Sequence, residues 1–130
     1  MLDTNTCIYL INKKSPKIFV HFKRCTVGEI GISSITLAEL EYGVSKSQHT
    51  HQNKLALREF ILPLEIGFFD NKASGVYGEI RSYLEKAGKP IGSMDTLIAA
   101  HALSLDVTLV TNNVSEFGRI KNLKITDWTI

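Results

Sequence analysis

The stretch GSMDTLIAAHALSLDVTLVTNN, residues 92–113, contains the features that decide the predicted fold. Its apolar residues surround almost the whole helical wheel from Met94 to Leu105, which is typical of a buried helix. Asp95 lies in the first turn, where the positive end of the helix dipole favours a carboxylate, and Ser93 is predicted to cap the helix. A short strand is predicted to follow, from Val107 to Thr111.

Asp95 is the charged residue of this helix that most needs an explanation. It is predicted to lie on the small-residue side of the helix, near Ala99 and Ala102, where another backbone or an ion could approach. A carboxylate there is unfavourable unless donors or a cation satisfy it. Polar residues end the following strand at Thr111–Asn113, and in an open α/β sheet ligands bind at that edge.

Length and composition indicate one globular domain. The chain has 130 residues, of which 44% are hydrophobic and 22% charged, close to the average for soluble proteins. A net charge of +2 does not by itself indicate nucleic acid, and two cysteines are too few for a disulfide framework. No signal peptide or membrane span is visible. We therefore predict a single domain over residues 1–130 that is cytoplasmic and has no membrane contact.

The rest of the sequence alternates between predicted strands and helices. Leu2 is predicted to end a first strand, and because two residues are too few for a strand, the true start is expected upstream of Met1. This alternation predicts an α/β, three-layer fold with a central, mostly parallel sheet of about five strands flanked by helices. The other predicted strands are Glu29–Ser33, Leu64–Phe69 and Leu123–Trp128, and the other predicted helices are Thr6–Ile11, 18–24, Thr36–Ser47, His49–Leu62 and Asn71–Ala87.

The acidic residues gather at one edge of this predicted sheet. Asp3 ends the first strand, Glu39 lies in the helix after the second, and Asp95 begins the helix before the fourth. Asn113 and Glu116 follow the fourth strand. Oxygen ligands without Cys or His suit a hard cation such as Mg²⁺ or Mn²⁺. Such a metal can lower the pKa of a bound water and offset the charge of a phosphate.

Each acid also has an ordinary structural interpretation. Asp3 could be only a helix cap, and Glu116 could be an exposed loop residue. Helical periodicity does not favour Glu39 over Glu41, because the apolar stripe of that helix lies closer to Glu41. Of the other possible ligands or nucleophiles, His101 is expected in the core, His49 and His51 do not share a helical face, and Cys7 is expected to be buried.

The basic residues form two groups. The first comprises Lys13, Lys14, Lys17, Lys23 and Arg24, and the second comprises Arg81, Lys86 and Lys89. Both patterns are typical of solvated helix faces, and both could also contact RNA phosphates. The second group directly precedes the Asp95 segment, so Arg81, Lys86 and Lys89 are the preferred substrate contacts.

Four motifs together resemble PIN-domain ribonucleases, and most of all the VapC-type toxins of bacterial toxin–antitoxin pairs. They are MLDTN at 1–5, SSITLAELEYG at 33–43, GSMDTLIAAHA at 92–102 and VTNNVSEF at 110–117, and the resemblance continues to IxDW at 125–128. The resemblance implies a PIN fold and a Mg²⁺-dependent endoribonuclease. It also implies a co-expressed antitoxin that inserts near the acidic site, a homodimer and a larger toxin–antitoxin complex.

By motif match, Asp3, Glu39 and Asp95 correspond to the acidic triad of the family. Asn113 stands where many members have a fourth Asp, and Glu116 where they have a further acid, so either could complete the site. Thr4, Asn5 and Thr111 are expected to orient the ligands or a phosphate. The T-N-N-x-x-E-F pattern resembles enterobacterial members that cut initiator tRNA, which suggests tRNA as the substrate.

Three alternative functions follow from the same residues. Asp3-x-Asn5-x-Thr faintly resembles the nucleophile loop of aspartyl-phosphate phosphatases, although Asn5 replaces its second acid. A metal-free ribonuclease would need two histidines in one site, and no pair is suitably placed. A catalytically impaired PIN domain that only binds RNA or its antitoxin is the third alternative, because Asn113 is not acidic.

Overall fold

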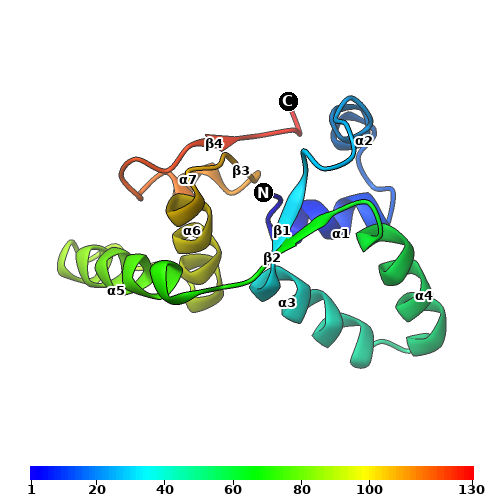
Figure 1. The fold of residues 1–130 in the computed structure, drawn as a ribbon, viewed down its shortest axis with the longest axis horizontal. Helices are drawn as coiled ribbons and strands as arrows, with labels where there is room; N and C mark the ends of the chain where they lie inside the picture. The colour runs from blue at the N-terminus through cyan, green and yellow to red at the C-terminus, as the bar shows by residue number, and fades with distance from the viewer.

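Short parallel strands lie at the centre of the molecule, with helices on both sides (Figure 1). The structure is a computed structural model that describes residues 1–130. In chain order its elements are α1 (Thr4–Ile11), α2 (Pro16–Lys23), β1 (Gly31–Ser33), α3 (Ser34–Ser45), α4 (Thr50–Ile61), β2 (Glu65–Gly67), α5 (Asn71–Lys86), α6 (Ser93–Leu105), β3 (Leu109–Val110), α7 (Val114–Phe117) and β4 (Ile125–Thr126).

The N-terminal residues join two parallel strand pairs into one arrangement. β1 pairs with β2 and β3 pairs with β4, both in parallel. Between them, the Leu2 N–H donates to Gly31 O at 3.0 Å, and the Asp3 N–H donates to Val110 O at 3.0 Å. Leu2 also forms a parallel bridge with Val110. This order, β2–β1–Leu2–β3–β4, confirms the predicted parallel sheet and brings the strand ends to one edge.

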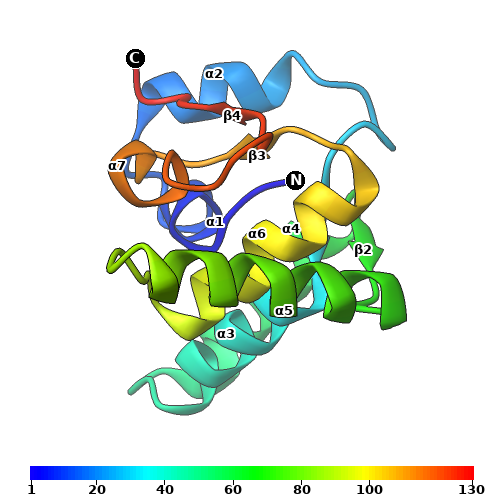
Figure 2. The same cartoon turned by 90° about the vertical axis from the view of Figure 1, so that its left-hand side faces the viewer.

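The hydrophobic core has one part on each side of these strands. The first part packs α1 to α4 around Leu2, Ile32 and Val110. The second packs α5, α6 and α7 around Leu109 and Phe117. Figure 2, turned by 90°, shows α5 lying across α6 on this second side. Helices thus cover both faces of the sheet, as the three-layer prediction requires. None of them combines the length and the apolar composition that a membrane span needs.

Most predicted elements are present, with boundaries that shift by a few residues. The strands are shorter than predicted: Glu29–Ser33 begins at Gly31, and Val107–Thr111 reduces to Leu109–Val110. Strand limits depend on where a partner can pair, which hydrophobic alternation does not report. The prediction that Ser93 caps α6 is wrong, because Ser93 is already helical and Gly92 occupies the cap position without a side-chain bond.

The buried character predicted for α6 is confirmed. Its residues Ile98, Ala99, Ala100 and Ala102 have no exposed surface, and the exposed residues lie at its ends. His101 is 1% exposed, and its Nδ1 lies 2.8 Å from the hydroxyl of Ser33, which caps α3. His101 is therefore a core residue, as predicted, and it links α6 to the start of α3.

Candidate functional site

A cleft of about 560 Å³ lies where the N-terminal ends of α1 and α6 meet the outer part of α3. It brings together Asp3, Glu39 and Asp95, which are far apart in the sequence. All three belong to the acidic set predicted from the sequence. The residues that line the cleft are Asp3, Thr4, Asn5, Ile8, Ala38, Glu39, Tyr42, Gly43, Lys46, Met94 and Asp95.

Asp3 has two roles in this geometry. It is the N-cap of α1, and its Oδ1 accepts the Thr6 N–H at 2.9 Å. Only 4% of the residue is exposed, yet it also lines the cleft, and its Oδ2 has no hydrogen-bond partner. The helix-cap interpretation and the site interpretation are therefore compatible, because each uses a different oxygen.

Glu39 is the glutamate of α3 that faces the cleft. The Thr4 hydroxyl donates a hydrogen bond to Glu39 Oε1 at 2.5 Å, which orients the carboxylate across the gap between α1 and α3. Glu41 is exposed and does not line the cleft. Tertiary packing thus resolves the choice that helical periodicity left open.

Asp95 is half-buried in the first turn of α6. Burial, and after it the negative charges of Glu39, Asp3 and Glu116, together raise the pKa of its carboxyl to about 6. All four acids therefore lie within electrostatic range of one another. Such repulsion is relieved when a cation binds among the carboxylates.

The raised pKa of Asp95 predicts a specific pH dependence of stability. The pKa of Asp95 in the folded protein, about 6, exceeds the ordinary value of 3.8. Between these two pH values the folded protein therefore keeps a proton on Asp95 that the unfolded chain has released. The stabilisation that this proton gives the folded state is fully present below the ordinary pKa and is lost as the pH rises through the folded pKa. In thermal melts with EDTA, we expect the parent protein to gain stability relative to Asp95→Asn as the pH falls from about 7 to about 5. Parallel pH profiles for the two proteins would contradict this.

Asn113 and Glu116 form a pair beside the cleft and do not line it. The Thr111 hydroxyl accepts the Asn113 N–H at 3.0 Å, and Asn113 Nδ2 donates to Glu116 Oε2 at 3.0 Å. Glu116 lies on α7, the helical turn that follows β3, and its charge acts on Asp95. Thr111, Asn113 and Glu116 are thus connected by hydrogen bonds, and the Glu116 charge acts on the Asp95 carboxylate of the cleft.

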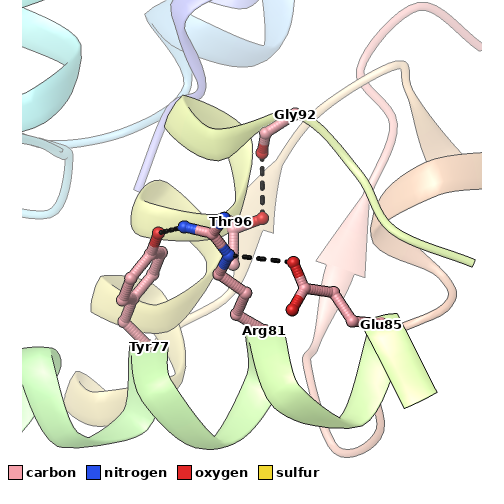
Figure 3. A network of polar contacts seen from close by, with 5 residues as sticks. All are labelled: Tyr77, Arg81, Glu85, Gly92 and Thr96. Atoms are coloured by element: carbon pink, nitrogen blue, oxygen red, sulfur yellow. Dashed lines mark hydrogen bonds and ion pairs between the residues drawn. The ribbon is translucent and has the colours of Figure 1, made fainter.

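The predicted RNA contacts on and after α5 lie outside the cleft. Figure 3 shows Arg81 bound within its own helix: Nη1 donates to Tyr77 Oη at 2.8 Å, and Nε donates to Glu85 Oε2 at 3.2 Å. The start of α6 lies nearby, where the Thr96 hydroxyl donates to Gly92 O at 2.9 Å. Lys86 and Lys89 are exposed and form no ion pair.

Two polar side chains of the cleft, Tyr42 and Lys46, were not singled out from the sequence. Tyr42 is 65% exposed, and the Lys46 ammonium lies 4.8 Å from the centroid of its ring. Both follow Glu39 at helical spacing on the same face of α3, and this spacing is the signal that could have identified them. Asn5 lines the cleft as well, is exposed and makes no side-chain hydrogen bond.

The remaining candidate ligands and nucleophiles lie elsewhere. His49 and His51 are exposed at the start of α4 and do not line the cleft. Cys7 has no exposed surface, and burial raises the pKa of its thiol, which confirms the prediction of a small buried residue. The cleft therefore offers oxygen donors and one lysine, with no histidine or cysteine among its lining residues.

The donor chemistry of the cleft fits a hard divalent cation. Its acids do not converge closely enough for any three of them to hold an ion directly. A small hard cation can be held through one or two carboxylates together with water and substrate phosphates, so the donor set is compatible with such an ion. Because Lys46 is the only basic residue that lines the cleft, the acids retain an excess of negative charge there.

The family model for the PIN domain matches residues 1–123. The chain belongs to the PIN-domain family. This PIN domain is 48% identical over 129 residues to ribonuclease VapC2 of Rickettsia felis, and the alignment covers 98% of this chain and 96% of that protein. It is 44% identical over 128 residues to the tRNA(fMet)-specific endonuclease VapC of Salmonella typhimurium, and this alignment covers 98% of this chain and 96% of that protein.

Solved structures place the PIN domain in the same subgroup. VapBC2 of Rickettsia felis, bound to a DNA fragment from its promoter, matches with a TM-score of 0.90 at 48% identity, covering 98% of this chain and 97% of that chain. DNA-bound VapBC of Salmonella typhimurium matches with a TM-score of 0.93 at 43% identity, covering 98% and 96%. The PIN domain is therefore of the VapC type, and this membership confirms the fold and the nuclease class predicted from the sequence.

Proposed function

We propose that this VapC-type PIN domain is a divalent-metal-dependent endoribonuclease and the toxin of a toxin–antitoxin pair. The observation that carries the proposal is the meeting of Asp3, Glu39 and Asp95, from α1, α3 and α6, in one cleft. Relatives that match along nearly the whole chain are named ribonucleases. In this proposal the three acids, with Glu116, are the catalytic residues, and Mg²⁺ is the cofactor, which Mn²⁺ can replace.

The acids of the cleft would hold the cation and position the RNA phosphate. A bound divalent cation supplies an activated water and offsets the phosphate charge. Asp3 is held in place by the Thr6 N–H, and Glu39 by the Thr4 hydroxyl. Because these bonds fix one oxygen of each carboxylate, the other oxygen is left for a ligand. Asn5 would contact a ligand or phosphate from the exposed start of α1.

Asn113 and Glu116 would complete the site as a unit. The amide of Asn113 donates its N–H to Glu116, so its own Oδ1 is the atom that could ligate a cation or hold a water. Glu116 would supply the negative charge that Asn113 lacks, directly or through a metal-bound water. Thr111 supports both residues, since its hydroxyl holds the Asn113 N–H.

We propose tRNA, and initiator tRNA in particular, as the substrate. The support is the Salmonella typhimurium relative named a tRNA(fMet)-specific endonuclease, together with the T-N-N-x-x-E-F motif at 111–117. Arg81, Lys86 and Lys89 are proposed phosphate contacts. For Arg81 this requires that its guanidinium exchange the bond to Glu85 for a phosphate.

We propose a VapB-like antitoxin as the protein partner, with a homodimer of this chain inside a larger toxin–antitoxin complex. The support is that the similar solved structures from Rickettsia felis and Salmonella typhimurium are VapBC complexes. The reaction would take place in the cytoplasm, where tRNA and a co-expressed antitoxin are both available.

The test is cleavage of tRNA by the purified chain, freed of any antitoxin. We expect cleavage with Mg²⁺ or Mn²⁺, none with EDTA, and recovery when the metal is restored. Products should have 5′-phosphate and 3′-hydroxyl ends, because water attacks instead of the ribose 2′-hydroxyl. Cyclic phosphate ends, or activity that survives chelation, would contradict the metal mechanism. Tight tRNA binding without any cleavage would support the alternative of a binding module.

A further inference from the structure

The segment from α1 to the loop after α2 has a concentrated positive charge. Between Thr4 and Gly28 the chain has five basic residues and no Asp or Glu. All five are exposed, and none of them forms an ion pair. We call this set the α2 basic surface: Lys13, Lys14, Lys17, Lys23 and Arg24.

The turn that presents Lys13 and Lys14 has a defined backbone. The Lys13 N–H donates to Leu10 O at 3.3 Å, and the Lys14 N–H donates to Tyr9 O at 3.0 Å, the pair of bonds that closes a helix C-terminus. Lys13 has φ of 54°, in the left-handed region where glycine is favoured. A lysine at this position is unfavourable for the backbone, and such outliers are often kept for function.

The inner face of α2 is docked, which leaves the charged face free. Ile18 is 1% exposed, and the ring of His21 stacks on Trp128 with centroids 5.5 Å apart. Figure 2 shows the C-terminal segment running beside α2. On the outer face, Phe19 is 43% exposed, and the Lys23 ammonium lies 5.4 Å from its ring centroid. Exposed cations beside an exposed aromatic ring are typical of surfaces that bind single-stranded nucleic acid.

The nearby acids keep their negative charge but form no ion pair with the five basic residues. Glu29, the first acid after the segment, accepts hydrogen bonds from the Thr26 backbone and hydroxyl. Asp127, next to Trp128, accepts from the backbone and hydroxyl of Thr129. On α5, by contrast, Glu85 pairs directly with Arg81. The α2 basic surface therefore has more uncompensated charge than the Arg81 group.

The α2 basic surface is one short helix away from the acidic cleft. Asp3 caps the start of α1, and Lys13 follows its end. The 8 residues of α1 span about 12 Å, which corresponds to roughly three or four stacked nucleotides. We propose that the α2 basic surface binds the phosphate backbone of the RNA substrate away from the cut. This inference rests on the proposed ribonuclease function. It adds a second RNA contact, which an RNA too short to extend beyond the cleft cannot reach.

The first experiment measures tRNA binding in an Asp95→Asn background, so that the RNA stays intact. One variant adds Lys13→Gln, Lys14→Gln and Lys17→Gln. Its matched control adds Lys54→Gln, Lys72→Gln and Lys121→Gln, which are exposed lysines elsewhere, so both variants lose three positive charges from the same background. We expect the first variant to bind tRNA roughly tenfold to a hundredfold more weakly at about 0.1 M salt, with a shallower salt dependence. The control should stay within about twofold of the parent.

The second experiment uses Lys13→Gly to separate structure from binding. Glycine relieves the left-handed backbone, so the melting temperature should rise, while loss of the charge should weaken tRNA binding. Greater stability with unchanged tRNA binding would overturn the inference for Lys13. A purely structural role for this residue would instead predict greater stability with tRNA binding as tight as that of the parent, or tighter.

Cleavage of tRNA by the parent protein tests the proposed function separately. With Asp95 intact, the triple α2 variant should cleave tRNA with a higher KM and an unchanged kcat. If the parent fails to cleave tRNA in Mg²⁺ or Mn²⁺, the proposed function fails and the binding result stands alone. The inference is overturned if the α2 variant binds tRNA normally, if the control loses as much, or if only antitoxin binding is lost.

Discussion

Asp95→Asn is expected to abolish RNA cleavage while the protein becomes more stable at neutral pH. The carboxylate is half-buried and repelled by Glu39, Asp3 and Glu116, so its removal lowers an unfavourable charge density. The same change removes a proposed cation ligand. Substituting residues that only support metal ligands typically lowers metal affinity or activity by about 10–100-fold. Removing a ligand itself should have a larger effect, so we expect kcat/KM to fall by more than about 100-fold. Stability should rise by about 1 kcal/mol, since partial exposure screens the repulsion.

Asp106→Asn is the matched control for this substitution. Asp106 ends the same helix, is exposed, and has φ of 54°, a conformation that Asn accepts readily. It should cleave tRNA like the parent, with no gain in stability at neutral pH. The measurements are single-turnover cleavage at saturating Mg²⁺ and thermal melts with EDTA. An Asp95→Asn protein that is folded and fully active would show that the site assignment is wrong.

Phe117→Ala is expected to be the most destabilising of the substitutions considered. Phe117 is 1% exposed and is the largest fully buried side chain, packed with Leu109 and Ile120 on the α5–α6 side of the sheet. Its truncation leaves a cavity in a core that cannot fully collapse, so we expect a loss of about 3–5 kcal/mol in the free energy of unfolding. For a chain of this size the melting temperature should fall by roughly 10 °C or more.

Val114→Ala provides the comparison, because Val114 lies on the same turn and is 46% exposed. It should lower the free energy of unfolding by less than about 1 kcal/mol. Denaturant unfolding followed by circular dichroism measures both variants. Phe117 also anchors α7, which holds Glu116, so the alanine variant should need more Mg²⁺ for cleavage even where it is folded. Equal stability of the two variants would contradict the assignment of Phe117 to the core.

The sequence by itself determined the alternation of strands and helices and the buried nature of α6. Both follow from local patterns: an all-apolar helical wheel from Met94 to Leu105 needs burial on every side. The same patterns predicted the polar edge where Asp3 and Asp95 lie. Strand limits and the helix cap at Ser93 were less predictable, because they depend on pairing partners and loop geometry, which are not encoded locally.

Only the tertiary structure shows how these acids come to share one cleft. Helical periodicity left Glu39 and Glu41 almost equivalent, and the resemblance to PIN-domain ribonucleases selected Glu39. The hydrogen bond from Thr4 across to α3 gives the physical reason for that choice. The two roles of Asp3 became compatible because its oxygens face different partners. The excess of positive charge around α2 was visible in the sequence. Only the structure shows that none of the five residues of the α2 basic surface forms an ion pair. Such choices depend on contacts between residues distant in the chain, and only folding sets those distances.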